Sequence, residues 1–215
     1  MLERGKMDRD LVEFVVIDQL VPKEHLLRKV DAAVDFTRLY EMVEPLYCED
    51  NGRPSIDPVV LFKMVLIQHL YGLPSLRRTA DEVSANICYR WFLGYTLQEE
   101  TPHFSTVSYN FRHRFTEETV DRVFAWILDE VAKAGYAQLY KCRKETIERV
   151  FADAKEKHAM RYTQYRGLAQ VTNWVKLKFA AMNLKKLAVW KWNDRSRLSL
   201  FRFFCPVYIR SPTTA

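Results

Sequence analysis

The sequence contains little glycine and proline, with 6 Gly and 8 Pro among 215 residues, and it has no low-complexity run. These absences exclude collagen-like, linker-like and repeat architectures. The four cysteines are scattered at positions 48, 88, 142 and 205 without a CxxC pair, so neither a zinc site nor a disulfide framework is indicated. The sequence shows neither 18 consecutive apolar residues nor a signal-peptide core. We therefore expect a cytoplasmic protein without a membrane partner.

The charge is distributed unevenly along the chain. Residues 1–137 carry 16 Lys and Arg against 22 Asp and Glu, whereas residues 138–215 carry 17 against 5, an excess of +12. A basic segment of this kind is attracted to polyanions such as nucleic acid. The alternative is a basic helix face that is simply solvated.

Local signals indicate a mainly α fold. Asp57 before Pro58 is typical of a helix start, and Ser75 and Ser105 are candidate N-caps of two further helices. The apolar spacing predicts helices over residues 59–71, 76–86, 106–115, 120–131, 143–158 and 168–192, with a strand or extended arm over 15–20. We expect three segments: an N-terminal helical domain (1–136), two longer basic helices (137–195), and a tail without an assigned fold (196–215).

Short helices joined by capped turns are typical of a helix-turn-helix, which places one helix in the major groove of DNA. An ordinary helical bundle is the alternative. The candidate DNA contacts of this part are Arg77, Arg78, Ser108, Arg112 and Arg114. In the basic segment, the candidate phosphate contacts are Lys176, Lys178, Lys185 and Lys186.

Several ordered motifs resemble bacterial insertion-sequence transposases. The N-terminal part resembles their N-terminal domain through GRPSIDP at 52–58, YGLPSLR at 71–77, RWFLG at 90–94 and PHFST at 102–106. The second part is similar to the C-terminal end of the same DDE transposases through RKETIERVFADAK at 143–155 and YRG at 165–167.

This resemblance implies an RNase H-like core, in which two aspartates on strands and one glutamate on a helix hold Mg²⁺ ions for attack on a DNA phosphate. Family members carry a tyrosine, an arginine, the catalytic glutamate and a lysine in fixed order, and Tyr140, Arg143, Glu148 and Lys155 match that order. The spacing from Glu148 to Lys155 fits. Four residues separate Arg143 from Glu148 where the family pattern has three.

The sequence leaves no room for the catalytic sheet of such a core. About a dozen residues separate Gly135 from the helix that carries Glu148, whereas an RNase H-like sheet needs several strands. Asp121, Asp129 and Asp153 fall on predicted helices, so Glu148 is the only member of a metal site that is matched. We expect an internally deleted transposase whose RNase H-like sheet is absent and which binds no Mg²⁺ itself.

Two functions follow from this interpretation. In the first, the chain still binds the DNA of the insertion-sequence ends but cannot cut it. In the second, it is a non-catalytic interaction protein that pairs with an intact transposase, or with itself, and inhibits the assembly. If the lysines of the last helix instead belonged to a helix that covered the lost sheet, an exposed apolar face would favour self-association.

Overall fold

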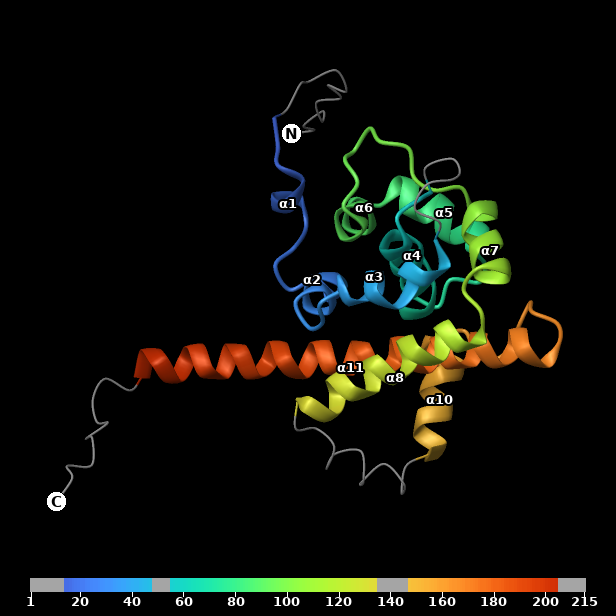
Figure 1. Ribbon diagram of the computed structural model, residues 1–215. Helices are drawn as coiled ribbons and strands as arrows, with labels where there is room; N and C mark the ends of the chain where they lie inside the picture. Colours follow the sequence, from blue (N-terminus) through green and yellow to red (C-terminus); the bar gives the residue numbers. More distant parts are fainter. Residues whose placement is uncertain (1–13, 48–54, 135–146, 205–215) are drawn as a thin grey trace, which may run out of the picture.

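The computed structural model describes residues 14–47, 55–134 and 147–204, with only the backbone described at 147–149 and 195–204. Within these residues every regular element is helical, which confirms the mainly α prediction (Figure 1). The elements are α1 (Ile17–Leu20), α2 (Leu26–Asp31), α3 (Arg38–Val43), the 3₁₀ turn η1 (Glu44–Leu46), α4 (Pro58–Leu70), α5 (Leu76–Ala85), α6 (Ile87–Leu93), α7 (Phe104–His113), α8 (Glu117–Lys133), α10 (Ile147–Lys157) and α11 (Leu168–Phe204).

Helix α4 forms the centre of the N-terminal bundle. It begins as predicted, since the Asp57 carboxylate accepts a hydrogen bond from the Val59 amide at 2.7 Å and Pro58 occupies the first helical position. The helix is apolar nearly all round, so most of its side chains are buried among α3, α5, α6 and α11. Gly72 ends the turn after α4 with a φ of +65°, and a Cβ there would lie 3.1 Å from the Lys157 carbonyl oxygen.

Side chains that accept hydrogen bonds from first-turn amide groups also define the starts of the neighbouring helices. Ser75 accepts from the Arg78 amide at 3.2 Å and caps α5, as predicted. Helix α7 begins two residues earlier than expected, because the side chain of His103, and not that of Ser105, accepts from the first-turn amide. Residues 17–20 form a short helix, so the expected strand or arm over residues 15–20 is wrong.

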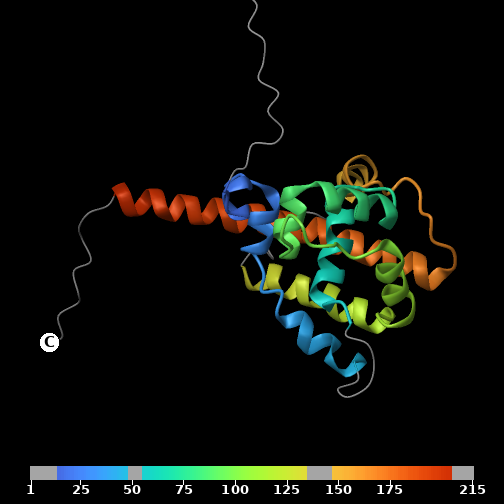
Figure 2. The same cartoon turned by 90° about the horizontal axis from the view of Figure 1, so that it is seen from above.

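Helix α11 joins the C-terminal segment to the N-terminal bundle. It runs along the base of the bundle beside α8 and also contacts α2 and α4 (Figures 1 and 2). Leu184 and Leu187 are fully buried in the same core as Leu27 of α2 and Ile67 of α4. One hydrophobic core therefore unites the predicted segments 1–136 and 137–195, while the boundary between them stays a prediction.

Among the described helices, none combines the length and apolar character that crossing a membrane requires.

Candidate nucleic-acid interface

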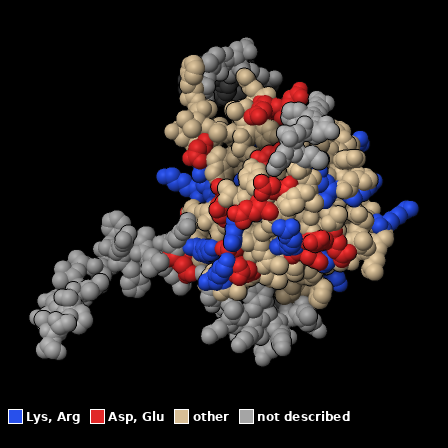
Figure 3. All heavy atoms as spheres, viewed as in Figure 1, with Lys and Arg blue, Asp and Glu red and all other residues tan. Residues whose placement is uncertain are grey.

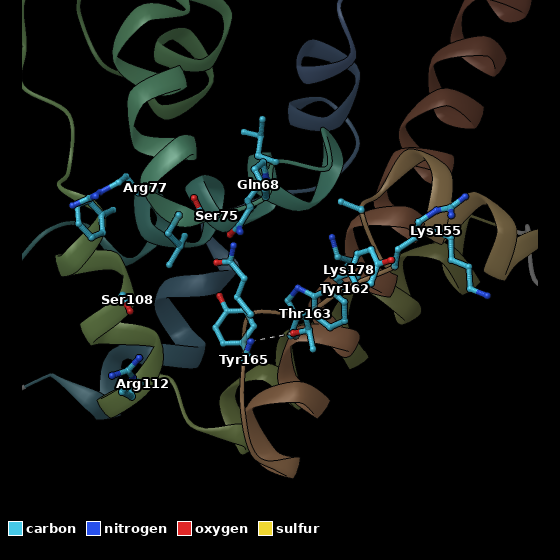
Figure 4. A pocket seen from close by; sticks show the side chains of 18 residues that line it. Gln68, Ser75, Arg77, Ser108, Arg112, Lys155, Tyr162, Thr163, Tyr165 and Lys178 are labelled. Atoms are coloured by element: carbon cyan, nitrogen blue, oxygen red, sulfur yellow. Dashed lines mark hydrogen bonds between the residues drawn. The ribbon is translucent and has the colours of Figure 1, made fainter.

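A cavity of about 600 Å³ lies where the N-terminal bundle meets the segment that links α10 to α11 (Figure 4). Figure 4 shows Arg77, Ser108 and Arg112 on one side of the cavity, with Lys155, Tyr162 and Lys178 on the other. Its lining is basic and aromatic: the cations are Arg77, Arg112, Lys155, Arg161 and Lys178, and the aromatic residues are Phe104, Tyr162, Tyr165 and Trp174.

The N-terminal wall is built by α4, α5 and α7. Gln68, near the end of α4, is buried, and its side-chain oxygen has no hydrogen-bond partner. The first turn of α5 also lines the cavity, and its amide groups carry the partial positive charge of a helix N-terminus. The Arg77 guanidinium lies over the Phe104 ring at 4.7 Å from its centre, an arrangement that orients the cation at the rim.

The C-terminal wall centres on Lys178 of α11. This residue is only 2% exposed, and its ammonium donates a hydrogen bond to the His158 carbonyl oxygen. The same ammonium lies 5.1 Å from the centre of the Trp174 ring. Burial lowers the pKa of Lys178 to about 8, because the charged form loses hydration that these two neighbours replace only in part.

Two buried histidines hold this wall against α4. His158 Nδ1 donates to the His69 carbonyl oxygen at 2.8 Å, which joins the end of α10 to α4. Burial, with smaller contributions from the neighbouring Lys178 and His158, lowers the pKa of His69 to about 3, and burial also lowers the pKa of His158. Both imidazoles are therefore neutral near pH 7, so Lys178 is the cation at the base of this junction.

The cavity is positive because its lining lacks compensating carboxylates. None of the described residues that line it is Asp or Glu. Arg161 pairs with Glu156, outside the cavity, whereas Arg77, Arg112 and Lys155 have no ion-pair partner in the described parts of the chain. Cations without an ion-pair partner that line one recess favour an anionic ligand.

The cavity brings together five of the predicted site residues: Arg77, Ser108, Arg112, Lys155 and Lys178. The others lie elsewhere. Arg78 pairs with Glu82 at 2.5 Å, and the Arg114 guanidinium lies 4.3 Å from the centre of the Tyr47 ring. Lys185 and Lys186 are half-buried on α11 and do not line the cavity.

Two of the candidate lysines of α11 have surroundings that the sequence does not show. Lys176 is held by Glu117 at 3.2 Å and by Asp121 at 2.5 Å, so its charge is already compensated within the chain. Lys178 is buried. Their roles as phosphate contacts stay predictions. The apolar periodicity of the sequence could not predict which of Lys176 and Lys178 is buried. The packing of α11 on α8 and on the segment around His158 decides this.

The residues matched to the catalytic motif are only partly described. Tyr140 and Arg143 lie outside the described residues, and Glu148 is placed by its backbone near the start of α10. The aspartates Asp121, Asp129 and Asp153 lie on helices, where they form ion pairs with Lys176, Lys133 and Lys157. No group of three potential metal ligands converges among the described residues, so the donor set there does not fit the two-metal site of a DDE core.

Sequence reasoning missed several cavity residues. Gln68, Trp174 and Arg161 belong to no motif, and they reach the cavity only through tertiary packing. Others lay within the quoted motifs without an assigned binding role, namely Ser75, Phe104 and Tyr165. Their place within those motifs was the signal that the sequence offered.

Two family models match the chain. The model described as Transposase domain (DUF772) matches residues 15–114, and the model described as Transposase DDE domain matches residues 104–188. Neither the curated proteins nor the solved structures contain a match. The two matches together span residues 15–188 and support an insertion-sequence DDE transposase, in agreement with the resemblance of its motifs. The cavity is lined from both matched stretches.

Proposed function

We propose that this chain is an internally deleted insertion-sequence transposase that binds the DNA of the element's ends without cutting it. The observation that carries the proposal is the short connection between α8, which ends at Lys133, and α10, which begins at Ile147. A typical strand has about 5–6 residues, so residues 134–146 are too few for a sheet of several strands with their turns.

The placement of the carboxylates supports the same proposal. Metal-dependent strand cleavage needs carboxylates that converge on two cations about 4 Å apart. Asp121 and Asp129 are on α8, and Asp153 is on α10, each engaged by a lysine. Glu148 alone cannot replace a set of three.

The cavity supports retained DNA binding. Phosphate groups are recognised by arginine and lysine side chains and by helix N-termini, and all three occur in the lining. Cations without carboxylate partners can bind phosphate without first breaking an internal ion pair. The family acts on DNA, so a DNA phosphate is the natural occupant.

Two assays on the full chain test the proposal. In a gel-shift titration with the DNA that flanks the coding sequence, we expect retention that weakens as salt increases. In an incubation of the same DNA with Mg²⁺ or Mn²⁺, we expect neither nicked nor joined products. A product that forms with the wild-type chain and disappears with Glu148→Gln would contradict the proposal, as would the lack of a salt-sensitive shift.

A second candidate function is pairing with an intact transposase. Helix α11 continues to Phe204, and Figures 1 and 2 show that its C-terminal part extends past the bundle. An extended helix end can dock on a partner chain. Co-purification of a tagged intact transposase with this chain, in nuclease-treated extract, would favour this candidate over DNA binding.

A further inference from the structure

We propose that the cavity holds a single nucleoside phosphate, with the phosphate on its cations and the base against its aromatic wall. The source is either an unpaired nucleotide at the end of a DNA strand or a free mononucleotide. This inference deepens the proposed function. The case in which the ligand is the end of a DNA strand rests on that function.

The size of the cavity excludes a duplex and admits one nucleotide. Its volume of about 600 Å³ lies in the range of sites that enclose a small organic ligand. A B-DNA duplex presents grooves to a protruding element and does not itself enter a recess of this size. The cations of the cavity face a recess, so they suit a strand end better than a continuous helix.

The two walls match the two halves of a nucleotide. Arg77 and Arg112 on the N-terminal wall can bind a phosphate, together with the first turn of α5. Tyr162, Tyr165 and Trp174 line the C-terminal part of the cavity and supply aromatic rings on which a base can stack. A phosphate alone would not require this second wall.

Gln68 adds a polar side chain to the N-terminal wall. It is 4% exposed and it lines the cavity, while its side-chain oxygen is closed to solvent and has no hydrogen-bond partner. The cations and the aromatic rings of the two walls therefore carry the inference, and Gln68 does not.

Fluorescence anisotropy with the full chain tests the inference. The probes are a labelled single-stranded oligothymidylate and a blunt duplex of equal length, with thymidine 5′-monophosphate and inorganic phosphate as competitors. We expect tighter binding of the single strand, and stronger competition by the mononucleotide than by phosphate at equal concentration.

Matched variants separate the two halves of the site. Tyr162→Ala should weaken single-strand binding about tenfold through lost stacking, while Tyr109→Ala, at an exposed tyrosine outside the cavity, should leave it unchanged. Arg112→Ala should weaken the binding of the mononucleotide and of the strand, whereas Arg122→Ala, on the exposed face of α8, should not. Tyr162 is 88% exposed, so its removal is not expected to unfold the chain.

The outcomes are distinguishable. Equal binding of single strand and duplex with no effect of Tyr162→Ala would overturn the inference and leave the proposed function standing. Equal competition by phosphate and mononucleotide would also overturn it, since the site would then recognise an anion only. Binding of mononucleotide without any binding of DNA would support a free nucleotide as the ligand and contradict the proposed function.

Discussion

Two sets of cations in this molecule differ in what surrounds them. Arg77, Arg112 and Lys155 converge on a cavity whose described lining has no carboxylate. Arg78 and Lys176 lie on the same helices, α5 and α11, that contribute to that cavity, but each is held by an acidic side chain. The comparison shows that the net charge of a segment does not measure the charge available to a ligand.

The surface supports this distinction. On the face seen in Figure 3, acidic and basic side chains are interspersed, without a continuous basic patch. Acidic residues of α8 compensate part of the +12 of the C-terminal segment, as Glu117 and Asp121 do for Lys176. The lysine and arginine residues of a segment are therefore not all equally available to a polyanion.

The largest expected effect comes from disrupting the packing of α11 on the bundle, because this packing positions both sets of cations. Leu187→Ala on α11 removes a fully buried side chain from the shared core, so we expect a loss of about 2–5 kcal/mol in the free energy of unfolding. Urea denaturation followed by circular dichroism measures it. Leu168→Ala, at a position 86% exposed on the same helix, is the control and should change stability by less than about 0.5 kcal/mol. Similar values for the two variants would mean that α11 does not dock on the bundle.

The second prediction concerns the junction behind the cavity. The pKa of His69 is about 3 in the folded chain and near its ordinary 6.5 when unfolded, so the unfolded state binds more protons between these values. Stability should then fall as pH decreases from 6.5, by at most about 1.4 kcal/mol per pH unit for this group. Thermal melts from pH 7.5 to pH 5 measure it. His69→Phe should flatten the profile, and an unchanged slope would contradict the assignment.

The third prediction sharpens the comparison of cations directly. The double variant Arg77→Ala and Arg112→Ala should lower DNA affinity about tenfold or more and reduce the salt slope by about 0.7–0.9 per lost phosphate contact. The matched double variant Arg78→Ala and Lys176→Ala should change affinity less than about twofold, because these cations are compensated within the chain. Gel shifts at several salt concentrations measure both. Equal losses of DNA affinity in the two double variants would show that ion pairing within the chain does not decide which cations can bind DNA.

The smallest expected effect comes from Lys178. Its pKa of about 8 means that it loses its charge as pH rises from 7 to 9, so the affinity for thymidine 5′-monophosphate should fall by about threefold over that range. The lowered pKa values of His69 and His158 keep these two neighbouring imidazoles neutral over that range. Isothermal titration calorimetry measures the affinity. Lys178→Met should remove the pH dependence; a dependence that persists would assign it to another group.

Much of the helical framework could be predicted from local signals. The Asp57 and Ser75 caps, the all-apolar α4 and the periodic α8 are properties of a few adjacent residues, and the structure confirms them. The His103 cap of α7 and the short α1 were missed, because an imidazole cap and a single helical turn leave weak local signals.

The sequence by itself determined the family, the helical class and the types of residue available for DNA binding, because motifs, caps and periodicity are local. Only the tertiary structure decided which of these residues act together. Arg77, Arg112 and Lys155 are far apart in the chain, and they meet because α11 docks on α4 and because His158 bonds to the His69 carbonyl oxygen. The same packing buried Lys178 and paired Lys176, two lysines that the sequence presents as equivalent. Burial and ion pairing depend on contacts between distant segments, and these contacts arise only when the core forms.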